Sequence, residues 1–191
     1  MNEAERPDPD RAVVLERLKE AVGLLAEGMA PELIPEVGTN IAYALADARD
    51  PGDVAAVMGR IVRLGDRVHP VGGAAFGASD HMARVVLTVM KFDPRVRSAA
   101  NIRYSPESVS VLEELMLEIC SFDRKREPSG VRTMDWGVAF CCRDGVPDII
   151  YDKGAVGKEP MIRVLGEDPV VVARNILNLS RRIWYAHLGT R

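Results

Sequence analysis

The feature that most restricts the fold of this chain is a hairpin signal set among well-separated helical patterns. The run IVRL at residues 61–64 ends at Gly65-Asp66, and a second strand-like run follows at residues 67–71. A two-residue turn of this kind between two such runs predicts an antiparallel hairpin. Hairpins mixed with helices favour a mixed sheet covered by helices on its faces, and they fit a purely parallel, doubly wound sheet less well.

Several segments carry capping residues and apolar residues at helical spacing. The pattern predicts a first helix that Asp10 caps, and Pro31 and Pro35 follow this helix too closely for a helix-turn-helix. Ser79 or Asp80 caps the second expected helix. The five expected helices lie at residues 10–27, 79 to before Pro94, 105–117, 134–142 and 168–184.

Short apolar runs between these segments predict the strands. Residues 53–57 read as a helical turn or as the start of a strand, and residues 72–77 read as a flexible glycine loop. The charged stretch 124–132 is the best candidate for a mobile lid. The remaining strands are expected at residues 36–46, 101–104, 119–123 and 147–152.

Length and charge restrict the class of protein. A chain of 191 residues suits one large domain, and we expect residues 1–10 to be a flexible N-terminus and residues 11–191 a single domain. A formal net charge of −3 argues against nucleic-acid binding. No apolar run approaches the roughly 20 residues that span a bilayer, and the N-terminus is acidic, so we expect a cytoplasmic protein without a membrane partner.

The cysteines and histidines give little support for a metal site. Cys120, Cys141 and Cys142 form no CxxC pair, so we expect reduced thiols. The chain has three histidines, which are His69, His81 and His187. This number is too small for several histidines to share one metal ion, and no metal ligand is assigned.

The first candidate site is the loop-to-helix segment Phe76–His81 (FGASDH). Free N–H groups at a helix start favour an anion, and His81 in the first turn could donate to a phosphate or move a proton. Ser79, in the same segment, is a candidate for contact with substrate or phosphate. A capped helix whose histidine only packs is an equally good interpretation.

Arg60 follows Gly59 and is the second candidate. In a strand, Arg60 and Arg63 would point to opposite faces, so only one of them could face a pocket. A planar guanidinium beside open backbone suits a bidentate phosphate contact, which favours Arg60. A solvated surface arginine explains the pattern equally well.

Polar residues near expected strand ends complete the set of candidates. Substrate or phosphate contacts are expected from residues in four segments, because α/β folds collect ligands at strand ends. For the segment at 121–124 we prefer solvated ion pairs. The segment 153–158 lacks the GxxxxGK[ST] order of a Walker loop, since Glu159 stands in place of Ser or Thr. These candidates are Asn40, Asn101, Arg103, Asp123, Arg124, Lys153 and Lys158.

Six blocks, taken in order, resemble the ThiN family of thiamine-phosphate synthases. The blocks are LIPEVGTNIAYAL (33–45), DVAAVMGRIVR (53–63), FGASDHMARVVL (76–87), NIRY (101–104), SFDRKREP (121–128) and PDIIYDKGAVGKEPMIRVLG (147–166). The resemblance implies a three-layer α/β/α fold with a mixed, mostly antiparallel sheet, related to class II aldolases. It also implies that an arginine and a histidine needed for activity fall on Arg60 and His81.

The resemblance further implies a reaction that joins hydroxymethylpyrimidine diphosphate to hydroxyethylthiazole phosphate. We expect Arg60 to bind the diphosphate and His81 to donate or shuttle a proton, with Lys153 or Lys158 as further phosphate ligands. Mg²⁺ is the cofactor considered, as an ion that bridges the diphosphate with few protein ligands. Asp80, Asp123 and Asp152 are candidates for contact with it, and none is assigned as a ligand.

The expected partners are therefore phosphorylated small molecules, and we expect a homo-oligomer. A non-catalytic sensor that only binds thiamine phosphate is the main alternative function. An aldolase or epimerase of the related fold is a third reading, which the shortage of histidine disfavours.

Overall fold

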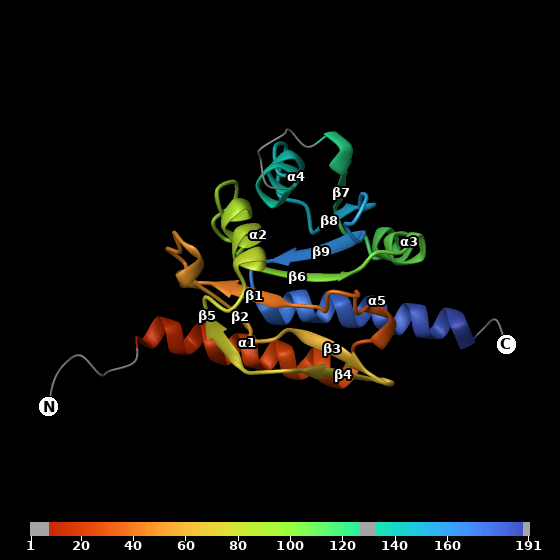
Figure 1. Cartoon of the computed structure of the whole chain (residues 1–191), viewed down its shortest axis with the longest axis horizontal. Coiled ribbons are helices and arrows are strands. Elements are labelled where there is room, and N and C mark those ends of the chain that lie inside the picture. The colour runs from red at the N-terminus through yellow and green to blue at the C-terminus, as the bar shows by residue number, and fades with distance from the viewer. Residues whose placement is uncertain (1–7, 127–132, 189–191) are drawn as a thin grey trace, which may run out of the picture.

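The computed structural model describes residues 8–126 and 133–188, and these form three layers (Figure 1). Within them, the middle layer is a seven-stranded sheet in the order β5-β2-β1-β6-β9-β8-β7. Neighbouring strands are antiparallel except β7 and β8, which run parallel. The strands are β1 (Ile41–Ala44), β2 (Val54–Val57), β5 (Ala74–Phe76), β6 (Ser98–Arg103), β7 (Ile119–Phe122), β8 (Ile149–Asp152) and β9 (Met161–Gly166).

Helices cover both faces of this sheet. In Figure 1, α1 and α5 run along one side of the sheet, and α2 and α4 lie on the other. The expected hairpin forms a separate two-stranded sheet, β3 (Ile61–Leu64) and β4 (Arg67–Pro70), and packs beside α1. The helices are α1 (Pro9–Gly28), α2 (Asp80–Met90), α3 (Pro106–Glu114), α4 (Thr133–Cys141) and α5 (Pro169–Leu188).

The alternation of side chains along the strands builds the two cores. In β1, Ile41 and Tyr43 pack into the core with α1 and α5, whereas Ala42 and Ala44 pack into the core with α2. All four residues of β1 are buried, as expected for a strand covered on both faces. The predicted three-layer α/β/α fold with a mixed, mostly antiparallel sheet is therefore confirmed.

Several boundaries differ from the sequence prediction. The first helix begins at Pro9, and Asp8 caps it in place of Asp10. Strand β1 is shorter than residues 36–46, because a bridge at Thr39 and a turn after Ala44 bound it. Of the two readings of residues 53–57, the strand is correct, and a 3₁₀ turn ends just before it.

Two strands were missed. Strand β5 lies in the stretch that was expected to be a glycine loop, and strand β9 follows the loop at 153–158 without having been assigned. Both are recognised only through their partners, since β5 pairs with β2 and β9 lies between β6 and β8. Of the expected lid, Arg124–Arg126 form a 3₁₀ turn, and residues 127–132 lie outside the described residues.

The expectation of three reduced thiols is wrong for two of them. Cys120 in β7 and Cys141 in α4 form a disulfide, with their Cα atoms 5.6 Å apart. The two residues are 21 positions apart in the sequence and meet because α4 packs on β7. Cys142 is free and buried, and burial raises the pKa of its thiol to about 11.

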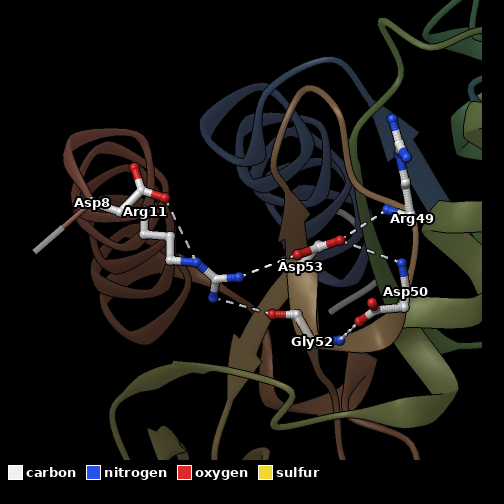
Figure 2. Close-up of polar contacts among 6 residues, drawn as sticks. All are labelled: Asp8, Arg11, Arg49, Asp50, Gly52 and Asp53. Atoms are coloured by element: carbon white, nitrogen blue, oxygen red, sulfur yellow. Dashed lines mark hydrogen bonds and ion pairs between the residues drawn. The ribbon is translucent and has the colours of Figure 1, made fainter. Parts of the chain in front are cut away.

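A polar cluster fastens α1 to the turn before β2 (Figure 2). The Arg11 guanidinium donates to the Gly52 carbonyl and to the Asp53 carboxylate, each at 3.2 Å. Asp53 also accepts from the backbone N–H groups of Arg49 and Asp50. These contacts hold the N-terminal end of β2 in place.

In the part of the chain that the structure describes, no helix is both long enough and apolar enough to cross a membrane.

Replacing Gly137 by alanine should destabilise the fold. A Cβ atom at Gly137 would lie 2.3 Å from Cε2 of Phe122. The Phe122 ring is rigid, so it cannot move aside as the end of a flexible side chain can. We expect a loss of about 1–3 kcal/mol in the free energy of unfolding, measured by urea denaturation. Gly23→Ala in α1 is the matched control, because no atom lies within 4 Å of its added Cβ. It should be neutral or stabilising by up to about 1 kcal/mol, and equal effects of the two variants would contradict the packing argument.

Candidate functional site

A cavity of about 280 Å³ lies where the start of β1, the end of β6 and the start of β9 meet the first turn of α2. Antiparallel pairing brings these segments to one edge of the sheet. The wall contains seven of the ten site residues predicted from sequence, which are Asn40, Arg60, Ser79, His81, Asn101, Arg124 and Lys158.

Arg60 reaches the cavity from a tight turn between β2 and β3. Gly59 and Arg60 both have positive φ, 68° and 70°, which is unfavourable for the arginine and marks a constrained position. The Arg60 side chain crosses Gly38, where a Cβ would lie 3.3 Å from its Cδ atom. Its Nη1 atom donates to the carbonyl of Val37. Backbone geometry before the strand, and not alternation within it, therefore directs Arg60 to the rim of the cavity.

The first turn of α2 forms another part of the wall. The Ser79 side chain caps the helix by accepting from the backbone N–H of Met82 at 3.3 Å. Ser79, His81 and Met82 all border the cavity, so the positive end of the helix dipole lies beside it. This arrangement favours a bound anion.

His81 stands in this turn with an unusual electrostatic environment. Its pKa is lowered to about 4, first because surrounding protein removes water from the imidazole and then because Arg163, Arg60 and Arg124 repel a proton. Asp80 acts in the opposite direction and is outweighed. Although neighbouring protein surrounds the imidazole, the residue as a whole is exposed, so solvent still reaches it at the rim of the cavity. His81 is therefore neutral at neutral pH and can donate one ring N–H while accepting at the other nitrogen.

Asn40 and Asn101 connect the strand ends at the cavity. The Asn101 carboxamide oxygen accepts from the Asn40 backbone N–H at 2.7 Å, and its Nδ2 donates to the Gly38 carbonyl at 3.0 Å. The Asn40 oxygen accepts from the backbone N–H groups of Ile41 and Val57, both at 2.9 Å. Both residues border the cavity, but their side chains bind backbone groups and so hold the neighbouring strands together. Their expected contact with substrate stays a prediction.

A buried ion cluster lies behind the wall of the cavity. Asp152, at the end of β8, is fully buried and accepts from Arg124 through Nε at 2.5 Å and Nη2 at 3.1 Å. It also accepts from Arg163 Nη1 at 2.9 Å and from the Gly154 N–H at 2.9 Å. Arg163 is 1% exposed, and together with Arg124 it forms part of the cavity wall. Burial, more than the neighbouring Arg124, lowers the pKa of Arg163, while Asp152 opposes this shift.

The loop after β8 forms part of the cavity wall through Gly157, Lys158 and Glu159. Ala155 and Lys158 form a tight turn with backbone hydrogen bonds of 3.0 and 2.8 Å. Glu159 then accepts from the backbone N–H groups of Glu36 and Val37, at 2.9 and 3.4 Å. Glu159 thus holds two loops together on either side of the cavity, and Lys158 is placed in the wall.

Three predicted residues lie elsewhere. Arg103 borders a separate cleft together with Arg63. Asp123 and Lys153 border a larger cavity of about 780 Å³ that shares only Arg124 with the first one. The structure therefore does not bring Arg103, Asp123 and Lys153 together with Arg60 and His81. Their expected contacts with substrate stay predictions.

Sequence reasoning missed Arg163, Gly38 and Glu159 in the wall. The only sequence signal for Arg163 is a single charge inside the apolar run MIRVLG at residues 161–166. A charge in such a run is unusual, because an ionised side chain is rarely buried without a partner. For its partner Asp152, the sequence suggests only a contact with Mg²⁺.

The described side chains do not form a protein-held magnesium site. Among residues 8–126 and 136–185, no group of three or more His, Cys, Asp or Glu side chains is placed to hold a metal ion. Asp152 directs its carboxylate oxygens to two arginines. An ion held mainly by a diphosphate stays a prediction.

Comparison with known proteins identifies close relatives. The profile of the family described as thiamine-phosphate synthase ThiN matches residues 17–178. The bifunctional thiamine biosynthesis protein ThiDN of Methanocaldococcus jannaschii is 46% identical over 167 residues, which cover 85% of this chain and 39% of that protein. The chain thus spans about two fifths of this longer relative. Thiamine-phosphate synthase ThiN of Methanothermobacter thermautotrophicus is 40% identical over 157 residues, covering 78% and 83% of the two chains.

Solved structures agree with the fold. The crystal structure of the C-terminal domain of protein MJ0236 has a TM-score of 0.86 and 42% identity, and covers 92% of this chain and 97% of that one. An aldolase II superfamily protein from Pseudomonas syringae has a TM-score of 0.55 at 9% identity, covering 100% and 82%. This second likeness shows a shared fold and nothing about activity.

The environment of His81 predicts its titration. Its pKa lies below the ordinary value of 6.5, so the His81 NMR signal should stay nearly constant between about pH 6 and 8 and should titrate near pH 4. Because the folded protein then binds fewer protons at His81 than the unfolded chain, this residue lowers the free energy of unfolding as pH falls from 6.5 towards 4.

Removing a positive charge near His81 should raise the pH midpoint of the His81 titration. Arg60→Met is expected to move the His81 titration upward, because one of the charges that repel the proton is lost. Arg97→Met is the matched control, since Arg97 borders a different cleft with Tyr43 and Asp53. A midpoint near 6.5 in the wild-type protein would contradict the described environment.

Proposed function

The chain belongs to the ThiN family of thiamine-phosphate synthases, and we propose that it joins hydroxymethylpyrimidine diphosphate to hydroxyethylthiazole phosphate, giving thiamine phosphate and diphosphate. The coverage of the ThiN relative, 83% of its length, supports a comparison of whole domains. The names of the relatives place them in thiamine biosynthesis, and the same role is proposed for this chain.

The observation that carries this proposal is the charge of the cavity. Arg60, Arg124, Lys158 and Arg163 border it, and Glu159 is the one carboxylate among the described residues of its wall. The whole chain has a formal net charge of −3, so this positive charge is a local feature. A small cavity with several cations and a helix N-terminus suits a phosphorylated ligand.

The reaction breaks the bond between the methylene carbon of the pyrimidine and an oxygen of the diphosphate. The thiazole nitrogen forms a new bond to that carbon, and the electron pair of the broken bond leaves with the diphosphate. Negative charge therefore grows on the leaving group, and fixed cations stabilise it most when they are already in place. Arg60, held by its turn and by the Val37 carbonyl, is the proposed contact at the rim.

His81 is proposed to donate a hydrogen bond or a proton to the departing diphosphate. The imidazole is neutral in the free protein because surrounding protein removes water from it and, second, because three arginines repel a proton. An arriving diphosphate offsets these charges, which should raise the His81 pKa and allow it to take up a proton. The ligand would thus prepare the acid that assists its own departure.

Mg²⁺ is proposed as an ion that accompanies the diphosphate, and no protein step is assigned to it. The expectations of a homo-oligomer, of a cytoplasmic location and of no nucleic-acid or membrane partner remain predictions.

The test is synthesis of thiamine phosphate from the two substrates with Mg²⁺. Arg60→Ala and His81→Ala should each reduce kcat by roughly 10²–10³-fold, the effect of removing a preorganised donor to a developing charge. Arg63→Ala is the matched control, since Arg63 lies three positions from Arg60, donates to the Gly65 carbonyl and borders another cleft. It should retain wild-type turnover.

Two results would contradict the synthase. Wild-type protein that binds thiamine phosphate tightly but shows no turnover would instead support the sensor. Full activity in both Arg60→Ala and His81→Ala would remove the proposed roles of these residues.

A further inference from the structure

Arg163 has more hydrogen-bonding capacity than its surroundings use. It lies in β9, directly opposite Asn101 of β6, on the face of the sheet that α2 and α4 cover. Its Nη1 atom donates to Asp152, whereas Nε and Nη2 are buried and have no partner within the described residues. A buried N–H group without an acceptor is costly, and a charged one more so.

The charges around Arg163 are also unbalanced. Arg163 and Arg124 share the single carboxylate of Asp152, so this buried cluster carries a net positive charge. The Phe122 ring lies 5.7 Å from the guanidinium carbon and supplies a weak cation–π contact, not a counter-charge. Arginine stays protonated in proteins, so the cluster cannot lose this charge by titration.

A purely structural role explains these features poorly. One arginine is enough to pair Asp152, because Arg124 already binds it through two nitrogens and the Gly154 N–H adds a third donor. A second buried arginine adds desolvation without adding a carboxylate. Water could satisfy the free donors, but water would leave the positive charge uncompensated.

We propose that Arg163 is an anion anchor, which binds a phosphate oxygen of a ligand in the cavity through its unpaired Nε or Nη2 group once the neighbouring side chains that cover these two atoms move aside. Arg163 itself forms part of the cavity wall, and Arg124 stands beside it in the same wall. Asp152 is then a positioning residue that holds both guanidinium groups in place. This inference rests on the proposed function for the identity of the ligand, while the anion site stands on the geometry alone.

The shared ligand chemistry is a phosphate group, which could come from the diphosphate or from the thiazole phosphate. The neighbours of the site agree with either source, since Arg60 and His81 border the same cavity. Arg163 also contributes to the repulsion that lowers the pKa of His81, so an anion bound to Arg163 would raise that pKa.

Isothermal titration calorimetry tests the anchor, with inorganic pyrophosphate in one arm and hydroxyethylthiazole phosphate in the other. Arg163→Met removes the charge but leaves Asp152 paired with Arg124 and Gly154. We expect the affinity for at least one of the two probes to fall roughly 10- to 100-fold, the range for a lost charged hydrogen bond. The arm that weakens identifies the phosphate that Arg163 holds.

The melting temperature of the protein without ligand distinguishes an anion anchor from a residue with a purely structural role. If Arg163 serves a ligand, Arg163→Met should melt at the same temperature as the wild type or higher, and stabilisation by the affected probe should be reduced. Arg163→Lys keeps the charge without the forked donor and should weaken the same arm, which preserves the test if the methionine variant does not fold. Arg97→Met is the control, because the Arg97 guanidinium donates to Tyr43 and to the Ala44 carbonyl and borders another cleft.

Failure of the anchor and failure of the synthase give different results. Wild-type affinity for both probes in Arg163→Met, or in Arg163→Lys where only that variant folds, would overturn the anchor even if turnover is normal. Failure of the wild-type protein to bind either probe would overturn it as well. Arg163-dependent binding of a probe without any synthesis of thiamine phosphate would support the anchor and contradict the proposed function.

Discussion

The Asp152 carboxylate organises the polar edge of the sheet. It receives donors from Arg124 in the 3₁₀ turn after β7, from the loop after β8 and from β9, and thereby sets the relative positions of three neighbouring segments. An ion cluster buried in this way is stable only with good geometry and full pairing. The pairing is complete at the carboxylate and incomplete at Arg163 within the described residues, and this asymmetry is the observation from which the anion anchor is proposed.

The same edge is fixed from the other side by amide hydrogen bonds. Asn40 and Asn101 connect β1, β2 and β6 and hold the backbone of Gly38, over which the Arg60 side chain passes. The cavity is thus lined by cations that come from separate segments, and Arg60, Arg124 and Arg163 are each held by hydrogen bonds to the protein. Such preorganisation places charge before the ligand arrives, which is the condition under which electrostatic catalysis is effective.

Local signals predicted much of the fold. The Gly65-Asp66 turn indicated the hairpin, the cap at Ser79 or Asp80 indicated the start of α2, and hairpins mixed with helices indicated a mixed sheet. The missed strands β5 and β9 depend on partners that are distant in the chain, and periodicity does not report such partners. The Cys120–Cys141 disulfide was missed for the same reason, because it joins a strand to a helix across 21 positions.

The lining of the candidate cavity was predictable where a residue type and a local motif coincide, as at His81 beside a helix start and Arg60 after a glycine. It was not predictable where burial decides the role. Arg163 becomes informative only once its strand is known to be central, and Asn40 proves to be engaged with backbone only once its hydrogen bonds are seen. Arg103 and Lys153 had the right chemistry and lie at other surfaces, a distinction that depends on tertiary structure.

A crystal structure of the protein with bound pyrophosphate tests the central claim most directly, namely that this cavity is a phosphate site built on Arg60 and Arg163. The account predicts pyrophosphate within the cavity, with oxygens in hydrogen-bond distance of the Arg60 guanidinium and of Nε or Nη2 of Arg163. Pyrophosphate bound instead beside Asp123 and Lys153, or in the cleft of Arg103, without contact to either arginine, would contradict it.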